Sequence, residues 1–238
     1  MKRDGLLILD GDDTLWAVEP LYDGSLEAAE RIVSEAGLDG QAWRARQRDL
    51  DLRNVATLGM SPERFPLSSK QALEDVARKH GVTPPESLVQ AVVDAAKAVF
   101  STVAPLVPGV DETLRRLGTR YHLALLTKGA EDVQNRRIDD SGLRGHFSVI
   151  SIVREKGERD FRLVAENFDA PPDHTWSIGN SLVSDINPAL RCGFNAIWID
   201  AHVWEHERRE TEPARSHLIT LGRFDELPEI LLAADRAI

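Results

Sequence analysis

Hydrophobic positions follow two different patterns along the chain, one typical of strands and one typical of helices. Leu6–Leu9 is an uninterrupted apolar run that leads directly into the acidic turn Asp10–Thr14. A short apolar run that ends in an acidic turn containing a glycine predicts a buried strand. Because ligands bind beyond the carboxyl ends of strands in open α/β sheets, we expect this turn to lie in a ligand site.

From Trp16 onward, for about ninety residues, apolar positions recur at helical spacing. Ala29, Ile32 and Val33 share one face of a first helix, which Gly37 is expected to end. Three more helices are predicted: one over Gln41–Leu58 with poorer periodicity, one with Ser69 as N-cap and Gly81 as its end, and one opened by Pro84-Pro85. Residues 18–104 are therefore expected to form an all-helical insert.

After Pro105, apolar runs alternate with amphipathic segments. The predicted strands are 122–126, 147–153, 176–178, 196–199 and 217–221, and a final helix carries Leu227, Ile230, Leu231 and Ala234 on one face. Strands that alternate with helices indicate a parallel sheet. The expected fold is α/β, with a Rossmann-like parallel-sheet core built from residues 1–17 and 105–238.

Composition narrows the class of partner. The chain has 238 residues, 42% of them hydrophobic, and a formal net charge of -10. The acidic balance argues against nucleic acid or an anionic membrane as the main partner. Cys192, the only cysteine, allows no intramolecular disulfide, and with no run long enough to span a bilayer we expect a soluble cytoplasmic protein. His202 and His206 have metal-ligand spacing, but their charged surroundings favour a solvated loop.

Asp10 and Asp12 are costly to place at the end of a buried strand unless a positive charge lies beside them. A divalent metal is the simplest such charge, although an Asp-rich turn after a strand is also a common feature without function. The apolar strand followed by D-x-D-x-T resembles motif I of the haloacid dehalogenase superfamily. This resemblance implies that Asp10 is a nucleophile and that Asp12 is a general acid and base.

Three later segments resemble the other motifs of that superfamily. Thr127 follows the second core strand, as in motif II, and a hydroxyl there could bind a phosphoryl oxygen. Lys156 follows the third, as in motif III, where an ammonium could neutralise the nucleophile and the transferring group, although a surface lysine is the usual alternative. Lys128 is a second candidate for that charge.

The segment Gly179–Asp185 resembles motif IV, commonly G-D-x-x-x-D. By resemblance, Asp185 would complete a Mg²⁺ site with Asp10 and the backbone carbonyl of Asp12. Asn180 replaces an acid of the common pattern, and its amide oxygen could still contact the metal directly or through water. Asp13 stands where many members have glycine.

The resemblance implies a phosphatase that acts on a small phosphorylated metabolite through an aspartyl-phosphate, with the helical insert as a cap over the active site. Asp12 argues against a dehalogenase, which needs no acid for a leaving alkoxide. A phosphomutase and a non-catalytic binding module remain alternatives. Trp16 and Arg53 are candidate substrate contacts, although the arginines Arg44, Arg46, Arg48 and Arg53 also fit a solvated helix face.

Overall fold

The computed structural model describes residues 3–200 and 218–232. His202, His206, His217 and Ala234 lie outside the described residues. The chain divides into two compact units, the first formed by Met1–Ala17 with Ala104–Ile238 and the second by Val18–Val103.

Unit 1 is built on a six-stranded parallel sheet with the order β3-β2-β1-β4-β5-β6. Its strands are β1 Gly5–Leu9, β2 Tyr121–Lys128, β3 Val149–Val153, β4 Thr175–Gly179, β5 Asn195–Ile199 and β6 Leu218–Leu221. The strand order changes direction between β1 and β4, which is the topological switch point where α/β sheets bind ligands. The predicted α/β fold with a parallel sheet is confirmed.

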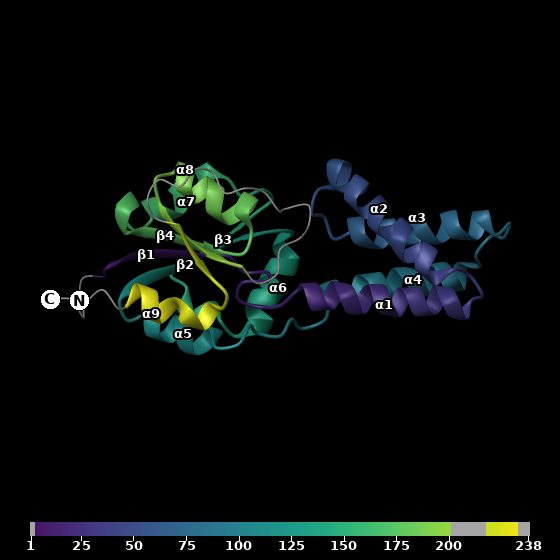
Figure 1. The fold of residues 1–238 in the computed structure, drawn as a ribbon, viewed down its shortest axis with the longest axis horizontal. Helices are drawn as coiled ribbons and strands as arrows, with labels where there is room; N and C mark the ends of the chain where they lie inside the picture. Colours follow the sequence, from purple (N-terminus) through teal and green to yellow (C-terminus); the bar gives the residue numbers. More distant parts are fainter. Residues whose placement is uncertain (1–2, 201–217, 233–238) are drawn as a thin grey trace. The chain divides into compact units, whose positions relative to one another are not determined.

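Helices cover both faces of this sheet. They are α5 Val110–Leu117, α6 Glu131–Ser141, α7 Glu158–Glu166, α8 Asn187–Arg191 and α9 Leu227–Leu231. Figure 1 shows α7 and α8 on one face and α5 and α9 on the other. Leu6 and Ile8 of β1 pack in one cluster with Phe161 and Val164 of α7. Because β1 is buried on both faces, its sequence is apolar throughout rather than alternating.

Unit 2 contains four α-helices, followed by a short 3₁₀ turn, Ala98–Phe100. They are α1 Glu19–Glu35, α2 Gly40–Leu58, α3 Arg64–Lys79 and α4 Glu86–Lys97. The unit has its own core, in which Val33, Trp43, Leu73 and Val92 are fully buried. Within the described part of the chain, no helix is both long and apolar enough to cross a membrane.

The predicted N-cap at Ser69 is wrong, because α3 begins at Arg64 and Ser69 lies inside it. The Ser69 hydroxyl donates to the carbonyl of Phe65, 2.9 Å away, and its own carbonyl accepts a hydrogen bond from the indole of Trp43 at 3.1 Å. A serine bonded to the carbonyl four residues earlier is satisfied within a helix. The Ser69 hydroxyl therefore bonds inside α3 and does not cap the N-terminus of the helix.

Polar contacts explain why the periodicity of α2 is poor. The Arg44 guanidinium lies 3.0 Å from Glu30 of α1, and that of Arg46 lies 2.7 Å from Asp75 of α3. These two side chains join helices, so the alternative of a purely solvated arginine face does not hold for them. Arg53 is exposed and pairs with Asp49 one turn earlier in α2.

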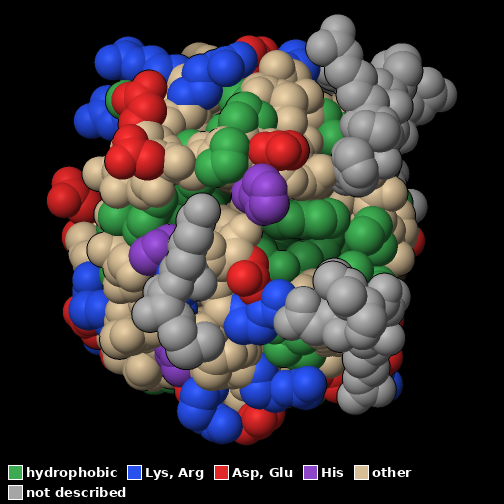
Figure 2. Space-filling model, turned by 90° about the vertical axis from the view of Figure 1, so that its left-hand side faces the viewer, with side chains coloured by type: hydrophobic (Ala, Val, Ile, Leu, Met, Phe, Trp, Pro, Cys, Tyr) green, Lys and Arg blue, Asp and Glu red, His purple; other side chains and the backbone are tan. Residues whose placement is uncertain are grey.

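The net negative charge does not form a single patch on the face drawn in Figure 2, where acidic and basic side chains are interspersed. Interspersed charge limits the potential that any one area of a surface can generate.

Candidate active site

The turn after β1 fixes the first two candidate residues. The backbone N–H of Asp10 donates to the carbonyl of Ile178 in β4 at 2.9 Å, so the pairing of β1 with β4 continues up to the backbone of Asp10.

 The segment after Asp10 forms a tight turn, because the N–H groups of Thr14 and Leu15 donate to the carbonyl of Gly11. Asp13 in this turn has a φ of 59°, in the left-handed region that glycine, asparagine and aspartate adopt most readily. This conformation accounts for an aspartate at a position where glycine is common.

Trp16 packs against the same turn. A Cβ on Gly11 would lie 2.6 Å from a ring carbon of Trp16, so only glycine fits beneath the indole. Trp16 is fully buried, and its indole N–H donates to Oδ1 of Asp12 at 2.7 Å. In this structure the indole N–H of Trp16 orients Asp12, and a direct contact between Trp16 and a substrate stays a prediction.

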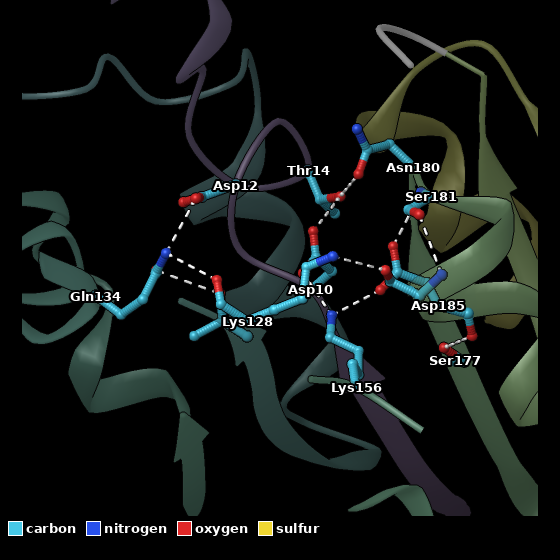
Figure 3. Close-up of polar contacts among 12 residues, drawn as sticks. Asp10, Asp12, Thr14, Lys128, Gln134, Lys156, Ser177, Asn180, Ser181 and Asp185 are labelled. Carbon is cyan, nitrogen blue, oxygen red and sulfur yellow. Dashed lines mark hydrogen bonds and ion pairs between the residues drawn. The ribbon is translucent and has the colours of Figure 1, made fainter. Parts of the chain in front are cut away.

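Lys156 joins Asp10 to Asp185 (Figure 3). Its Nζ lies 2.6 Å from Oδ1 of Asp10 and 2.6 Å from Oδ1 of Asp185, and only 2% of the Lys156 side chain is exposed. The surface-lysine alternative does not hold for this residue. The structure thus brings the ends of β1, β3 and β4 together around one buried ammonium.

Burial and charge act on both partners of this cluster. Burial, followed by the neighbouring charge of Asp185, raises the pKa of Asp10 to about 7, although Lys156 opposes the shift. For Lys156, burial lowers the pKa, but the two carboxylates Asp10 and Asp185 outweigh burial and raise it above its ordinary value. Two carboxylates therefore share a single positive charge in a buried site.

Two serines near the end of β4 hold Asp185 in place, one by its backbone N–H and one by its hydroxyl. The N–H of Ser181 donates to Oδ2 of Asp185 at 2.9 Å, and the Ser177 hydroxyl donates to the carbonyl of Asp185 at 2.9 Å. The segment Leu182–Ile186 is a single π-helical turn, a form that often occurs at functional sites. The sequence pattern did not predict this turn.

The side chain of Asn180 contacts the turn that follows β1. Its Oδ1 lies 3.4 Å from the hydroxyl of Thr14, which in turn lies 3.2 Å from Oδ2 of Asp10. The Asn180 carbonyl accepts a hydrogen bond from the indole of Trp198 at 2.9 Å. Thr14 therefore links the nucleophile candidate to Asn180.

Asp12 points to a different set of partners, which the sequence analysis missed. Oδ2 of Asp12 accepts from Gln134 at 3.0 Å and from Arg137 at 2.5 Å, both on α6. The Thr127 hydroxyl, fully buried at the end of β2, donates to Oε1 of Gln134 at 3.2 Å. The available sequence signal was the spacing of Gln134, Arg137 and Ile138, which places two polar residues on the buried face of α6.

Of the two remaining substrate-binding candidates, Lys128 lies at the same sheet edge, at the end of β2, and Arg53 belongs to the other unit. Lys128 donates from Nζ to the hydroxyl of Ser184 at 3.2 Å, on the loop after β4. Arg53 belongs to unit 2, where it pairs with Asp49. Cys192 is buried at the end of α8.

The donor atoms suit a hard cation. Within residues 3–200 and 218–232, no group of three or more His, Cys, Asp or Glu residues is placed to hold a metal ion. The expected set needs only two such side chains, Asp10 and Asp185, together with the backbone carbonyl of Asp12. Two buried carboxylates with one shared ammonium leave an excess of negative charge, which an oxygen-binding cation would balance.

The fold and the four strand-end segments define a class of hydrolase. Residues 5–193 match the sequence profile of the haloacid dehalogenase-like hydrolases, and the chain belongs to this family. The family resemblance drawn from the four motifs is confirmed.

Relatives match over nearly the whole chain. Phosphoserine phosphatase of Thermus thermophilus is 29% identical over an alignment of 258 positions that covers 96% of this chain and 98% of the relative. Pyrimidine 5′-nucleotidase YjjG of Escherichia coli is 24% identical, covering 97% and 99%. The crystal structure of a haloacid dehalogenase-like family hydrolase from Xanthomonas campestris has a TM-score of 0.81 at 26% identity, covering 99% of this chain and 98% of that one.

Proposed function

We propose that the protein is a magnesium-dependent phosphatase that hydrolyses a small phosphomonoester through an aspartyl-phosphate on Asp10. The observation that carries this proposal is the buried cluster of Asp10, Lys156 and Asp185, with Asp12 two residues beyond the nucleophile. The names of the two relatives, a phosphoserine phosphatase and a nucleotidase, support the same substrate class.

In the first step, a carboxylate oxygen of Asp10 attacks phosphorus while the ester P–O bond breaks. Asp12 gives its proton to the departing oxygen, which leaves as an alcohol. Lys156 stabilises the negative charge that the nucleophile and the transferring group bring together. The products are the free alcohol and phosphorylated Asp10.

In the second step, water attacks the phosphorus of the aspartyl-phosphate. The carboxylate of Asp12 accepts a proton from this water, and the bond between phosphorus and the Asp10 oxygen breaks. Inorganic phosphate leaves, Asp10 is restored as a carboxylate, and Asp12 carries the proton needed for the next cycle.

Magnesium would be held by the carboxylates of Asp10 and Asp185 and by the backbone carbonyl of Asp12. When bound, it supplies positive charge that reduces the repulsion between an anionic phosphate ester and the anionic nucleophile. Thr14 contacts the carboxylate of Asp10 directly, and Asn180 contacts Thr14.

We further propose that unit 2 acts as a cap that selects the substrate. Its two connections leave unit 1 side by side, because the N–H of Ala17 donates to the carbonyl of Pro105 at 2.8 Å and Trp16 pairs with Leu106. Both connections therefore begin at the turn that carries Asp10 and Asp12. A unit attached there is suited to control access to the site.

The test is release of inorganic phosphate from p-nitrophenyl phosphate, measured with magnesium and with a chelator, for the natural protein and Asp10→Asn. We expect activity only with magnesium, and a loss of at least about a thousandfold in Asp10→Asn. Activity that survives in pure Asp10→Asn would refute the nucleophile assignment. A screen of phosphate esters with product analysis separates hydrolysis from isomerisation of the substrate, which a phosphomutase would catalyse instead.

A further inference from the structure

The carboxylate of Asp12 is surrounded by hydrogen-bond donors from two elements. The Trp16 indole N–H binds Oδ1, whereas Gln134 and Arg137 of α6 both bind Oδ2. With both oxygens occupied, the side chain is held in one orientation. Asp12 is 29% exposed, and this orientation is therefore not imposed by tight packing alone.

Arg137 has a single polar partner among the described residues. Only 8% of its side chain is exposed, its Nη1 binds Asp12, and its Nη2 is buried with no hydrogen-bond partner there. Burying a guanidinium costs several kcal/mol unless its donors are satisfied. The contact with Asp12 is thus the one polar contact that this buried guanidinium makes within the described residues.

Gln134 is fixed at both ends of its amide. Oε1 accepts from the Thr127 hydroxyl, and Nε2 donates to Oδ2 of Asp12 and to the carbonyl of Lys128 at 3.2 Å. Because both neighbours of Nε2 are acceptors, the reverse orientation of the amide would oppose oxygen to oxygen. A Cβ on Gly129 would lie 2.9 Å from Nε2, and glycine there leaves room for this arrangement.

We propose that Arg137 and Gln134 are positioning residues that hold Asp12 for proton transfer, and that Gln134 ties Asp12 to Thr127 at the end of β2. This inference rests on the proposed function, in which Asp12 protonates the departing oxygen. It goes further in assigning α6 to the reaction. Loss of this positioning should slow esters with a basic leaving oxygen more than esters with a weakly basic one, because only the former need a well-placed acid.

The experiment compares kcat/KM for p-nitrophenyl phosphate, whose leaving group departs without a proton, with kcat/KM for phenyl phosphate, whose leaving group is more basic. The variants are Arg137→Met, Gln134→Met and Arg137→Lys. Arg136→Met is the matched control, because this neighbouring arginine on α6 is 57% exposed and pairs only with Asp140 in the described structure.

We expect Arg137→Met and Gln134→Met to lose about tenfold or more on phenyl phosphate and less than about threefold on p-nitrophenyl phosphate, within the range that a placed acid contributes. Arg137→Lys keeps a charged donor and should recover part of the loss. Arg136→Met should match the natural protein on both esters.

Equal losses on the two esters, or no loss, would overturn the positioning role. Circular dichroism and thermal unfolding check the fold of each variant, and if Arg137→Met does not fold, Gln134→Met and Arg137→Lys give the same comparison. Failure of the proposed function is a separate result, in which the natural protein hydrolyses neither ester or Asp10→Asn retains its activity.

Discussion

At the scale of single residues, close packing around Asp185 makes Gly179 a sensitive position. A Cβ on Gly179 would lie 2.3 Å from Oδ2 of Asp185 and 2.4 Å from its Cγ. Asp185 is only 1% exposed and is held by Lys156 and Ser181, so it has no free direction in which to move. An alanine at this position must displace either the carboxylate or the loop that carries it.

We therefore predict that Gly179→Ala loses most of its phosphatase activity and about 1–3 kcal/mol of the free energy of unfolding, as expected for overpacking. Urea unfolding and phosphate release measure the two effects. Gly222→Ala is a suitable control, since Gly222 lies outside the helices and strands and no atom beyond its chain neighbours lies within 4 Å of a Cβ built there. Natural activity in Gly179→Ala would show that Asp185 need not hold its position.

Asn180 offers a test of the metal site. Its side-chain oxygen lies beside Thr14, and an aspartate there would keep an acceptor in place while adding one negative charge. Because ligand charge tunes affinity for hard cations, we predict that Asn180→Asp lowers the magnesium concentration giving half-maximal activity. Activity measured across a magnesium titration decides it, and an unchanged or higher half-saturating concentration would show that this side chain does not sense the metal.

The residues that were predictable from sequence are those next to strand ends. Asp10 follows β1 directly, and Lys156 and Asp185 lie in the loops after β3 and β4. Parallel strands bring such residues to one edge of a sheet. Gln134 and Arg137 carry no such signal, because their contact with Asp12 depends on how α6 packs. The hydrogen bond from the Thr127 hydroxyl to Gln134 also depends on how α6 packs, so the sequence did not predict it.

At the scale of secondary-structure elements, the Arg46–Asp75 pair joins α2 to α3. Its guanidinium binds Asp75 through Nε and Nη2, both at 2.7 Å. The hydrogen bond from Arg46 lowers the pKa of Asp75 below its ordinary value of 3.8, against the opposing effect of burial. Since the folded pKa lies below the unfolded one, the pair stabilises the fold above about pH 4 and loses this contribution as the pH falls through the folded pKa.

We predict that Asp75→Asn lowers the free energy of unfolding by up to about 1 kcal/mol at pH 7. The difference from the natural protein should shrink as the pH falls from about 4 through the lowered pKa of folded Asp75, because below that pKa Asp75 is protonated in both the folded and the unfolded natural chain. Urea unfolding at several pH values measures this. Arg53→Met, which removes an exposed pair within α2, should change stability less, and a pH-independent loss in Asp75→Asn would contradict the ion-pair explanation.

Helices and strands with strong periodicity were largely predictable, whereas element ends decided by tertiary contacts were not. The start of α3 shows the difference, because Ser69 carries the sequence signature of a cap but finds its partner inside the helix. In α2, paired arginines and buried polar residues such as Gln47 obscure the apolar stripe that periodicity requires.

At the scale of the whole molecule, strand order could not be derived from sequence, yet it creates the site. Asp10 and Asp185 are far apart along the chain, and they meet at Lys156 because β1 and β4 are neighbours. Unit 2 is inserted between β1 and the rest of the sheet without interrupting it. Each unit therefore buries its own core, and we expect the two to open separately.

The last prediction tests this independence with two matched substitutions, Leu73→Ala in unit 2 and Leu114→Ala in unit 1. Both leucines are fully buried, and each loss should cost about 2–5 kcal/mol through lost burial and the cavity left behind. Amide hydrogen exchange should accelerate mainly in α1–α4 for Leu73→Ala and mainly in unit 1 for Leu114→Ala, because local opening follows the core that is weakened. If either substitution accelerates exchange equally in both units, the chain opens as a single cooperative structure and the insert is not an independent unit.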